Sequence, residues 1–150
     1  MKKIIFILLL FIVGCSNEND PKVLFENGEY EKSFKLWMSR AVNDDRVAQN
    51  YVGIYYYLGL GLPRNYMFAK QWFEKAAMNG LADAQYNLGV MYENGEYVEK
   101  DYVTAYKWFY IANYKGNTHA SRRMQGLADE HKLFPNQMRR AEVLAEEFLD

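Results

Sequence analysis

The sequence predicts an all-α fold, an α/α solenoid in which antiparallel helix hairpins are stacked side by side. The chain matches itself at a spacing of 36 residues. Each matching unit holds two segments with the apolar spacing of a helix. A repeat of about twenty to fifty residues is typical of stacked units that bury their apolar faces against one another. The recurring landmarks pair Ala48 with Ala84, Gly53 with Gly89, Tyr56 with Tyr92, Gly59 with Gly95, Ala69 with Ala105, Trp72 with Trp108, and Gly80 with Gly116.

Each unit is predicted to be a helix hairpin. In the second unit Ala84, Leu88 and Met91 share one helix face, and Gly95 ends that helix. Asp101 is expected to cap the following helix, since its carboxylate can accept the free N–H groups of the first turn. The apolar stripe of this second helix consists of Tyr102, Ala105, Trp108, Phe109 and Ala112, and Gly116 ends it.

Small residues in the repeat predict close helix packing. Ala84, Gly89 and Ala105 recur where two helices of a hairpin face each other, so the backbones can approach closely. Trp72 and Trp108 are expected to fill the space between adjacent hairpins. The aromatic stripe is therefore interpreted as core rather than as a cofactor site.

These residues resemble the Sel-one-like repeat, a relative of the tetratricopeptide repeat. The resemblance covers Ala48 to Gly116, with Val52 and Asn65 as mild departures from leucine and aspartate. It implies a tetratricopeptide-like solenoid over residues 21–150. The expected units are a partial unit at 21–44, repeats at 45–80 and 81–116, and a degenerate closing unit at 117–150.

The first residues are expected to be a targeting signal rather than part of the fold. Met1–Lys3 is basic, Ile4–Val13 is an apolar run too short to span a bilayer, and Ile12–Cys15 resembles a bacterial lipobox. We therefore expect residues 1–14 to be a lipoprotein signal peptide, and residues 15–20 to be a lipidated Cys15 and short tether. By resemblance to Gram-negative lipoproteins, Ser16 favours anchoring at the outer membrane, facing the periplasm. In a Gram-positive host the same signal places the domain on the outer cell face.

Composition and motifs argue against several classes of function. Removing Lys2 and Lys3 leaves 16 basic and 19 acidic residues, so the mature chain carries −3 and has no basic patch for nucleic acid. Cys15 is the only cysteine, which leaves no disulfide framework. His119 and His131 stand in no metal-ligand spacing, and neither a nucleophile elbow nor a phosphate-binding glycine loop occurs. We expect neither catalytic activity nor a cofactor.

A partner-binding face can be predicted from the first helix of each unit, which lines the concave side of a stacked array. After the core positions are set aside, the remaining residues at spacings of three and four share one face. Tyrosine and arginine among them are common interface anchors. The predicted residues are Asn50, Ile54, Tyr57, Asp83, Tyr86, Val90, Glu93, His119 and Arg122.

The sequence leaves three hypotheses for function. The first is a membrane-anchored module that holds a protein partner of the bacterial envelope on the concave face. The second is an immunity protein that neutralises a secreted phospholipase-type toxin, a role that some lipidated members of the family resemble. The third is binding of cell-wall peptide or glycan, in which tyrosines stack on sugars. No bound cofactor is implied by any of them.

Overall fold

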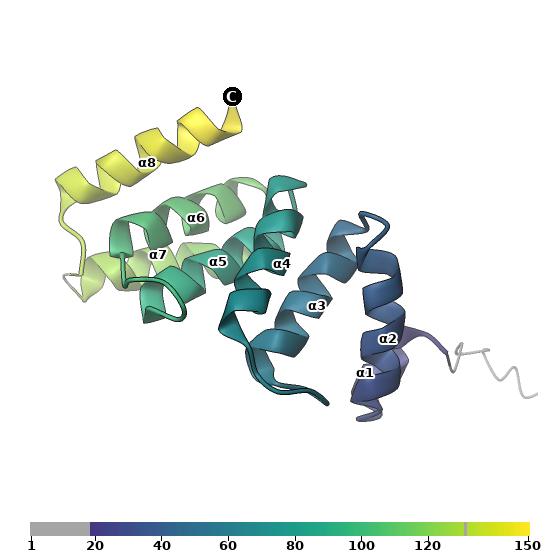
Figure 1. Ribbon diagram of the computed structural model, residues 1–150. Coiled ribbons are helices and arrows are strands. Elements are labelled where there is room, and N and C mark those ends of the chain that lie inside the picture. The colour runs from purple at the N-terminus through teal and green to yellow at the C-terminus, as the bar shows by residue number, and fades with distance from the viewer. Residues whose placement is uncertain (1–18, 131) are drawn as a thin grey trace, which may run out of the picture.

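The computed structural model describes residues 19–130 and 132–150, which form eight α-helices and no β-strand (Figure 1). The signal peptide and lipidation expected at residues 1–14 and at Cys15 lie outside the described residues. The helices are α1 (Pro21–Glu26), α2 (Tyr30–Ala41), α3 (Arg46–Leu58), α4 (Tyr66–Met78), α5 (Ala82–Asn94), α6 (Tyr102–Tyr114), α7 (Thr118–Asp129) and α8 (Pro135–Leu149).

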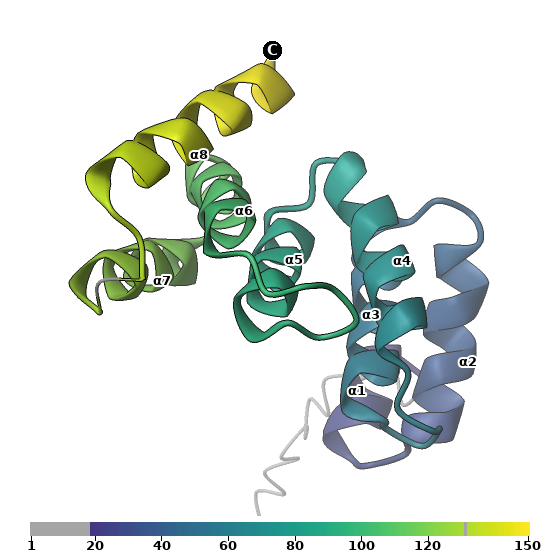
Figure 2. The ribbon, with the colours of Figure 1, turned by 60° about the vertical axis from the view of Figure 1, so that its left-hand side comes forward.

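The helices are stacked as the predicted solenoid. α3 pairs with α4 and α5 pairs with α6, and each of these hairpins contacts the helix that follows it along the chain. Figures 1 and 2 show the hairpins lying side by side in chain order from α1–α2 to α7. The all-α solenoid predicted from the repeat is therefore confirmed, and the partial first unit consists of the six-residue α1 and a full α2.

The predicted helix ends are also confirmed. The Asp101 carboxylate accepts the N–H groups of Val103 and Thr104 at 2.9 and 3.1 Å. Asn65 accepts the N–H of Phe68 one period earlier. Gly95 ends α5 in the left-handed conformation, with φ 76°. These caps satisfy backbone groups that a helix end leaves without an intrahelical partner.

In the α3–α4 and α5–α6 hairpins, a glycine on the first helix lies directly against a phenylalanine on the second. A Cβ atom on Gly53 would come within 2.5 Å of the Phe73 ring, and one on Gly89 within 2.5 Å of the Phe109 ring. Both rings are completely buried. The two phenylalanines therefore fill the space that the glycines leave between the two helices of a hairpin.

The expected role of the tryptophans is only partly right. Trp108 is 9% exposed and packs in the cluster that joins α4 to α6. Trp72 is only partly buried, at the edge of the apolar cluster that Trp37 of α2 and Val52 of α3 belong to. The expectation that Trp72 fills the space between adjacent hairpins therefore holds only in part, because its indole packs against residues of α2 and α3 but stays partly exposed.

A buried glutamine ties the α3–α4 hairpin, and another the α5–α6 hairpin, to the helix that precedes it. The Gln49 amide donates to the carbonyl of Ala41 at 3.3 Å, and the Gln85 amide donates to the carbonyl of Ala77 at 3.1 Å. Both glutamines are fully buried and lie 36 residues apart. A buried amide is stable only where it is hydrogen-bonded, so this contact fixes how far one hairpin is set from the next.

The C-terminal unit departs from the repeat. α8 packs mainly on α6 rather than on α7, its neighbour in sequence. In α7 the place of the repeat glycine is taken by the exposed Gln125, and Gly126 has no atom within 4 Å of an added Cβ. α7 therefore offers no socket for an aromatic ring, and α8 covers the outer side of α6 instead (Figure 2).

Two residues with side chains occupy left-handed backbone positions that the neighbouring repeat fills with glycine. Tyr97 has φ 61° where Gly61 has 68°, and Asp44 has φ 61° where Gly80 has 76°. This conformation costs a residue with a Cβ atom about 1–2 kcal/mol. Both turns are therefore less stable than their counterparts.

Tyr97→Gly is expected to raise the free energy of unfolding by about 0.5–1 kcal/mol, because the relief of strain exceeds the chain entropy that glycine loses. Little packing is lost, since Tyr97 is 58% exposed. Urea denaturation measures the change. The control is Gln71→Gly on the exposed side of α4, which should lose about 1 kcal/mol. Equal losses in both variants would contradict the strain.

Candidate functional site

The face formed by α3, α5 and α7 carries three adjoining hollows, and we call it the α3/α5/α7 face. One hollow lies between α3 and α5 beside Phe73, one between α3, α5 and the start of α7, and one between α5 and α7. Residues Ile54 and Tyr86 each line two of the hollows. The hollows therefore form one continuous surface across three repeats.

The structure brings all nine sequence-predicted residues to this surface. Every one of them lines at least one of the three hollows. The first hollow takes Ile54, Tyr57 and Val90; the second takes Asn50, Ile54, Asp83, Tyr86 and His119; the third takes Tyr86, Glu93, His119 and Arg122.

Two side-chain hydrogen bonds join consecutive repeats beneath the second hollow. Asn87 donates through Nδ2 to Asn50 Oδ1 at 2.9 Å, and Asn117 donates through Nδ2 to Asp83 Oδ1 at 2.8 Å. Asn50 and Asn117 are 6% and 8% exposed. These bonds hold the polar groups of the floor in one arrangement before any partner binds, which lowers the entropic cost of binding.

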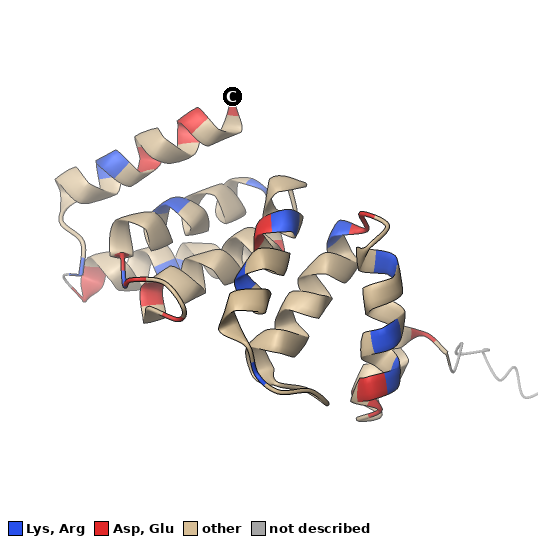
Figure 3. Cartoon of the chain, viewed as in Figure 1, with Lys and Arg blue, Asp and Glu red and all other residues tan. Residues whose placement is uncertain are grey.

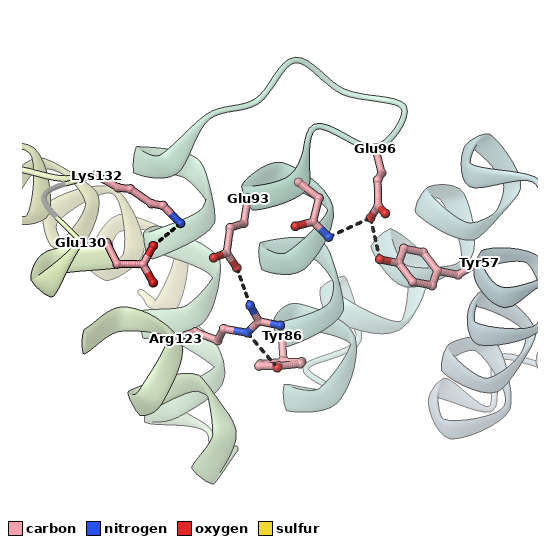
Figure 4. A network of polar contacts seen from close by, with 8 residues as sticks. Tyr57, Tyr86, Glu93, Glu96, Arg123, Glu130 and Lys132 are labelled. Atoms are coloured by element: carbon pink, nitrogen blue, oxygen red, sulfur yellow. Dashed lines mark hydrogen bonds and ion pairs between the residues drawn. The ribbon is translucent and has the colours of Figure 1, made fainter. Parts of the chain in front are cut away.

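Arg123 links α7 to two side chains of α5 (Figure 4). Its Nε donates to Tyr86 Oη at 3.3 Å, and its Nη1 lies 3.2 Å from Glu93 Oε2. The hydrogen bond to Tyr86 raises the pKa of the Arg123 guanidinium, and the charge of Glu93 raises it further. The Glu93 side chain is only 11% exposed, so its charge needs this partner.

Tyr57 is fixed in a similar way at the other end of the face. Its hydroxyl donates to Glu96 Oε2 at 2.6 Å (Figure 4). Burial raises the pKa of Tyr57 well above its usual value, and the adjacent Glu96 carboxylate raises it further. The phenol therefore remains a neutral donor at physiological pH and orients Glu96.

Several residues that line this face or contact its side chains were not predicted from the sequence, among them Asn87, Arg123, Glu130 and the Tyr57 partner Glu96. Asn87 was detectable, because it is four residues after Asp83 and three before Val90 and so shares their side of the helix. Arg123 was passed over in favour of its neighbour Arg122. Glu96 lies in a loop, where helical spacing carries no information about direction.

Charge on the face is mixed. The Glu93 carboxylate of α5 lies beside Arg123 of α7, and the Glu96 carboxylate of the following loop lies beside Tyr57 of α3 (Figure 4), while Figure 3 shows both signs of charge over α5 and α7 together. Within residues 19–130 and 132–150, no three His, Cys, Asp or Glu side chains are grouped closely enough to hold a metal ion. Over the same residues, no helix is both long and apolar enough to cross a lipid bilayer.

Comparison with known proteins identifies the repeats. Residues 46–81 and 82–117 each match the Sel1 repeat family model. The fold is similar to a crystal structure of a Sel1 repeat protein from Oxalobacter formigenes, with 32% identity and a TM-score of 0.69. That match covers 85% of this chain and 54% of the other.

A second similar structure is c5321, a protective antigen present in uropathogenic Escherichia coli strains that displays an SLR fold. It is 29% identical with a TM-score of 0.77, over 86% of this chain and 28% of that one. A third relative, the ERAD-associated E3 ubiquitin-protein ligase component HRD3B of Arabidopsis thaliana, is 36% identical over 67 residues, which are 44% of this chain and 11% of HRD3B. The chain thus spans about half of one relative and far less of the other two.

Proposed function

The chain is a Sel1-repeat solenoid, and from this premise we propose that it is a non-catalytic module that holds a protein partner on its α3/α5/α7 face. Repeat solenoids present extended surfaces, and Sel1 repeats serve as protein–protein interaction modules. The relative HRD3B is named as a component of an ERAD-associated E3 ubiquitin-protein ligase, which agrees with this kind of role.

The observation that supports this proposal is the continuity of the three hollows. The nine residues predicted from the repeat pattern all line one surface. Its floor is held by hydrogen bonds between repeats, and partly buried tyrosines are presented there with exposed His119 and Arg122 at one end. Aromatic and arginine side chains on a pre-organised surface are the usual anchors of protein interfaces.

We further propose that the module is exported and anchored to the membrane through a lipid on Cys15, with the outer membrane of a Gram-negative cell as its location. The basic start, the apolar run and the small residue before cysteine support this part of the proposal.

Cys15→Ser is expected to move the protein from the membrane fraction to the soluble fraction, because a signal without the modified thiol cannot receive the anchor. Metabolic labelling with a fatty-acid analogue, followed by fractionation, measures the change. Asn17→Ser is the control and should remain labelled. Equal membrane recovery of the two variants would show that Cys15 is not the anchor.

The partner is to be identified by pull-down from solubilised envelope with residues 16–150, which contain all three apolar clusters of the fold. One stoichiometric partner that is an exported lipase, whose toxicity the module suppresses, would establish the immunity role. A multi-protein envelope assembly would establish the scaffold role. Recovery of wall fragments alone would favour glycan binding and contradict a protein partner.

Once the partner is identified, Arg122→Glu is expected to weaken its binding at least about tenfold, since the charge is reversed inside the third hollow. The control is Lys115→Glu, which makes the same reversal at an exposed position outside all three hollows. Calorimetric titration measures both affinities. Equal affinities for the wild type and Arg122→Glu would move the interface away from this face.

A further inference from the structure

A separate apolar groove lies on the outer side of the stack, between α2 and α4, and we call it the Trp72 groove. Its volume is about 840 Å³, and the sequence analysis did not predict it. Met38 lies on the α2 side, with Phe68, Trp72 and Met78 along α4. Phe68 is 39% exposed and Met78 is 69% exposed, so large apolar side chains face solvent here.

The same position one repeat later is not open. Trp108, which lies 36 residues after Trp72, is covered by α8, and the Phe148 ring meets the indole edge-on with centroids 5.3 Å apart. Phe148 and Leu149 pack into the cluster that contains Trp108 of α6 and Ala76 of α4. The chain itself therefore shows what fills this kind of groove, an amphipathic helix with an aromatic anchor.

A lysine ammonium lies near each of the two indoles, although the two lysines come from different positions of the repeat. The ammonium of Lys75 is 5.2 Å from the Trp72 ring, and that of Lys107 is 4.7 Å from the Trp108 ring. Residues 19–130 and 132–150 provide no counterpart of Phe148 on Trp72. Figure 2 shows α8 lying along α6, whereas α2 and α4 have no such helix over them.

Charge indicates which kind of helix the groove accepts. The second half of α8 is acidic, with Glu142, Glu146, Glu147 and Asp150 and no basic residue after Arg140. In the Trp72 groove, Lys75 belongs to the lining, and Lys35 is three residues before Met38 on the same side of α2. Neither lysine is ion-paired within the described residues. Figure 3 shows further basic residues along α2.

Glu74, the acidic residue on the α4 side of the lining, is already paired with Lys70, and Asp44 lies in the loop at the end of α2. The Asp44 carboxylate accepts a hydrogen bond from Gln49 Nε2 at 3.4 Å, and the charge in contact with the indole itself is the ammonium of Lys75. We propose that the Trp72 groove binds an acidic amphipathic helix of a partner protein, with an aromatic side chain of that helix placed on Trp72 as Phe148 is placed on Trp108. This surface is distinct from the α3/α5/α7 face, and the proposal stands independently of the function proposed for that face.

The test uses residues 16–150 and a fluorescent peptide with the α8 sequence, residues 135–150, held helical by a staple between the exposed positions 139 and 143. Fluorescence anisotropy is expected to show saturable binding. Met78→Glu should weaken it about tenfold or more, because a carboxylate then faces the acidic helix at the groove. A peptide carrying Phe148→Ala should bind at least about tenfold more weakly.

Tyr114→Glu is the matched control. Tyr114 lies 36 residues after Met78, is equally 69% exposed and is absent from the groove lining. Its substitution should leave peptide binding unchanged. If Tyr114→Glu weakens binding and Met78→Glu does not, the peptide has displaced α8 from Trp108, and the proposal is overturned.

Two other outcomes also overturn the proposal. The first is an absence of saturable binding at peptide concentrations up to several hundred micromolar. The second is a protein that dimerises without peptide and becomes monomeric in Met78→Glu, measured by light scattering, because the occupant is then a second copy of the chain.

Discussion

Gly89→Leu is expected to lower the free energy of unfolding by about 3 kcal/mol or more, because the new side chain has no space between α5 and α6. A single Cβ atom at this position would already be 2.5 Å from Phe109 Cε1, and Phe109 is completely buried. Denaturation by urea, followed by circular dichroism, measures the loss.

Alanine separates this steric cost from helix propensity. An exposed Gly→Ala change within a helix gains about 1 kcal/mol, and Gly126 in α7 has open space beside it. We therefore expect Gly126→Ala to stabilise the protein and Gly89→Ala to destabilise it. If Gly89→Ala also raised the stability, the close contact with Phe109 would not be what the glycine provides.

Ala145→Glu is expected to release α8 from the stack. Ala145 is completely buried in the cluster that includes Trp108, and a glutamate there would place an unpaired charge in an apolar contact. The expected cost is about 3 kcal/mol or more. In a solenoid this cost is local, so hydrogen exchange should show loss of protection in α8 while α3 and α4 remain protected.

Val143→Glu serves as the control, since Val143 is on the same helix but 40% exposed. We expect α8 to keep its protection in that variant. Loss of protection along the whole chain in Ala145→Glu would mean that the stack unfolds as one unit, and would contradict local release.

The fold could be predicted because the same packing contacts and helix caps recur at the same positions of each full repeat. Gly89 and Phe109 recur with Gly53 and Phe73, and the caps at Asn65 and Asp101 recur with them. Periodicity locates such positions without knowledge of the partner atoms. It could not show that phenylalanine rather than the adjacent tryptophan faces the glycine, since a difference of one position turns a side chain by about 100° around the helix.

The α3/α5/α7 face was predictable for the same reason, because its residues lie at fixed places in the repeat. Arg123 could not be selected over Arg122, since its role depends on reaching Tyr86 and Glu93 on another helix. The placement of α8 was also beyond the pattern, because α8 follows the last full repeat and its contacts with α6 lie outside the periodic part. The Trp72 groove is visible only once that placement is known.

Because α8 packs back onto α6, it covers the tryptophan of the last full repeat. A hairpin stacked on α6 in place of α8 would first have to uncover Trp108, whereas a 36-residue unit inserted between α2 and α6 would leave that contact intact. Each unit inserted in this way would extend the α3/α5/α7 face and would add another tryptophan groove on the outer side. The α3/α5/α7 face and the row of tryptophan grooves would therefore lengthen together, by one repeat for each inserted unit.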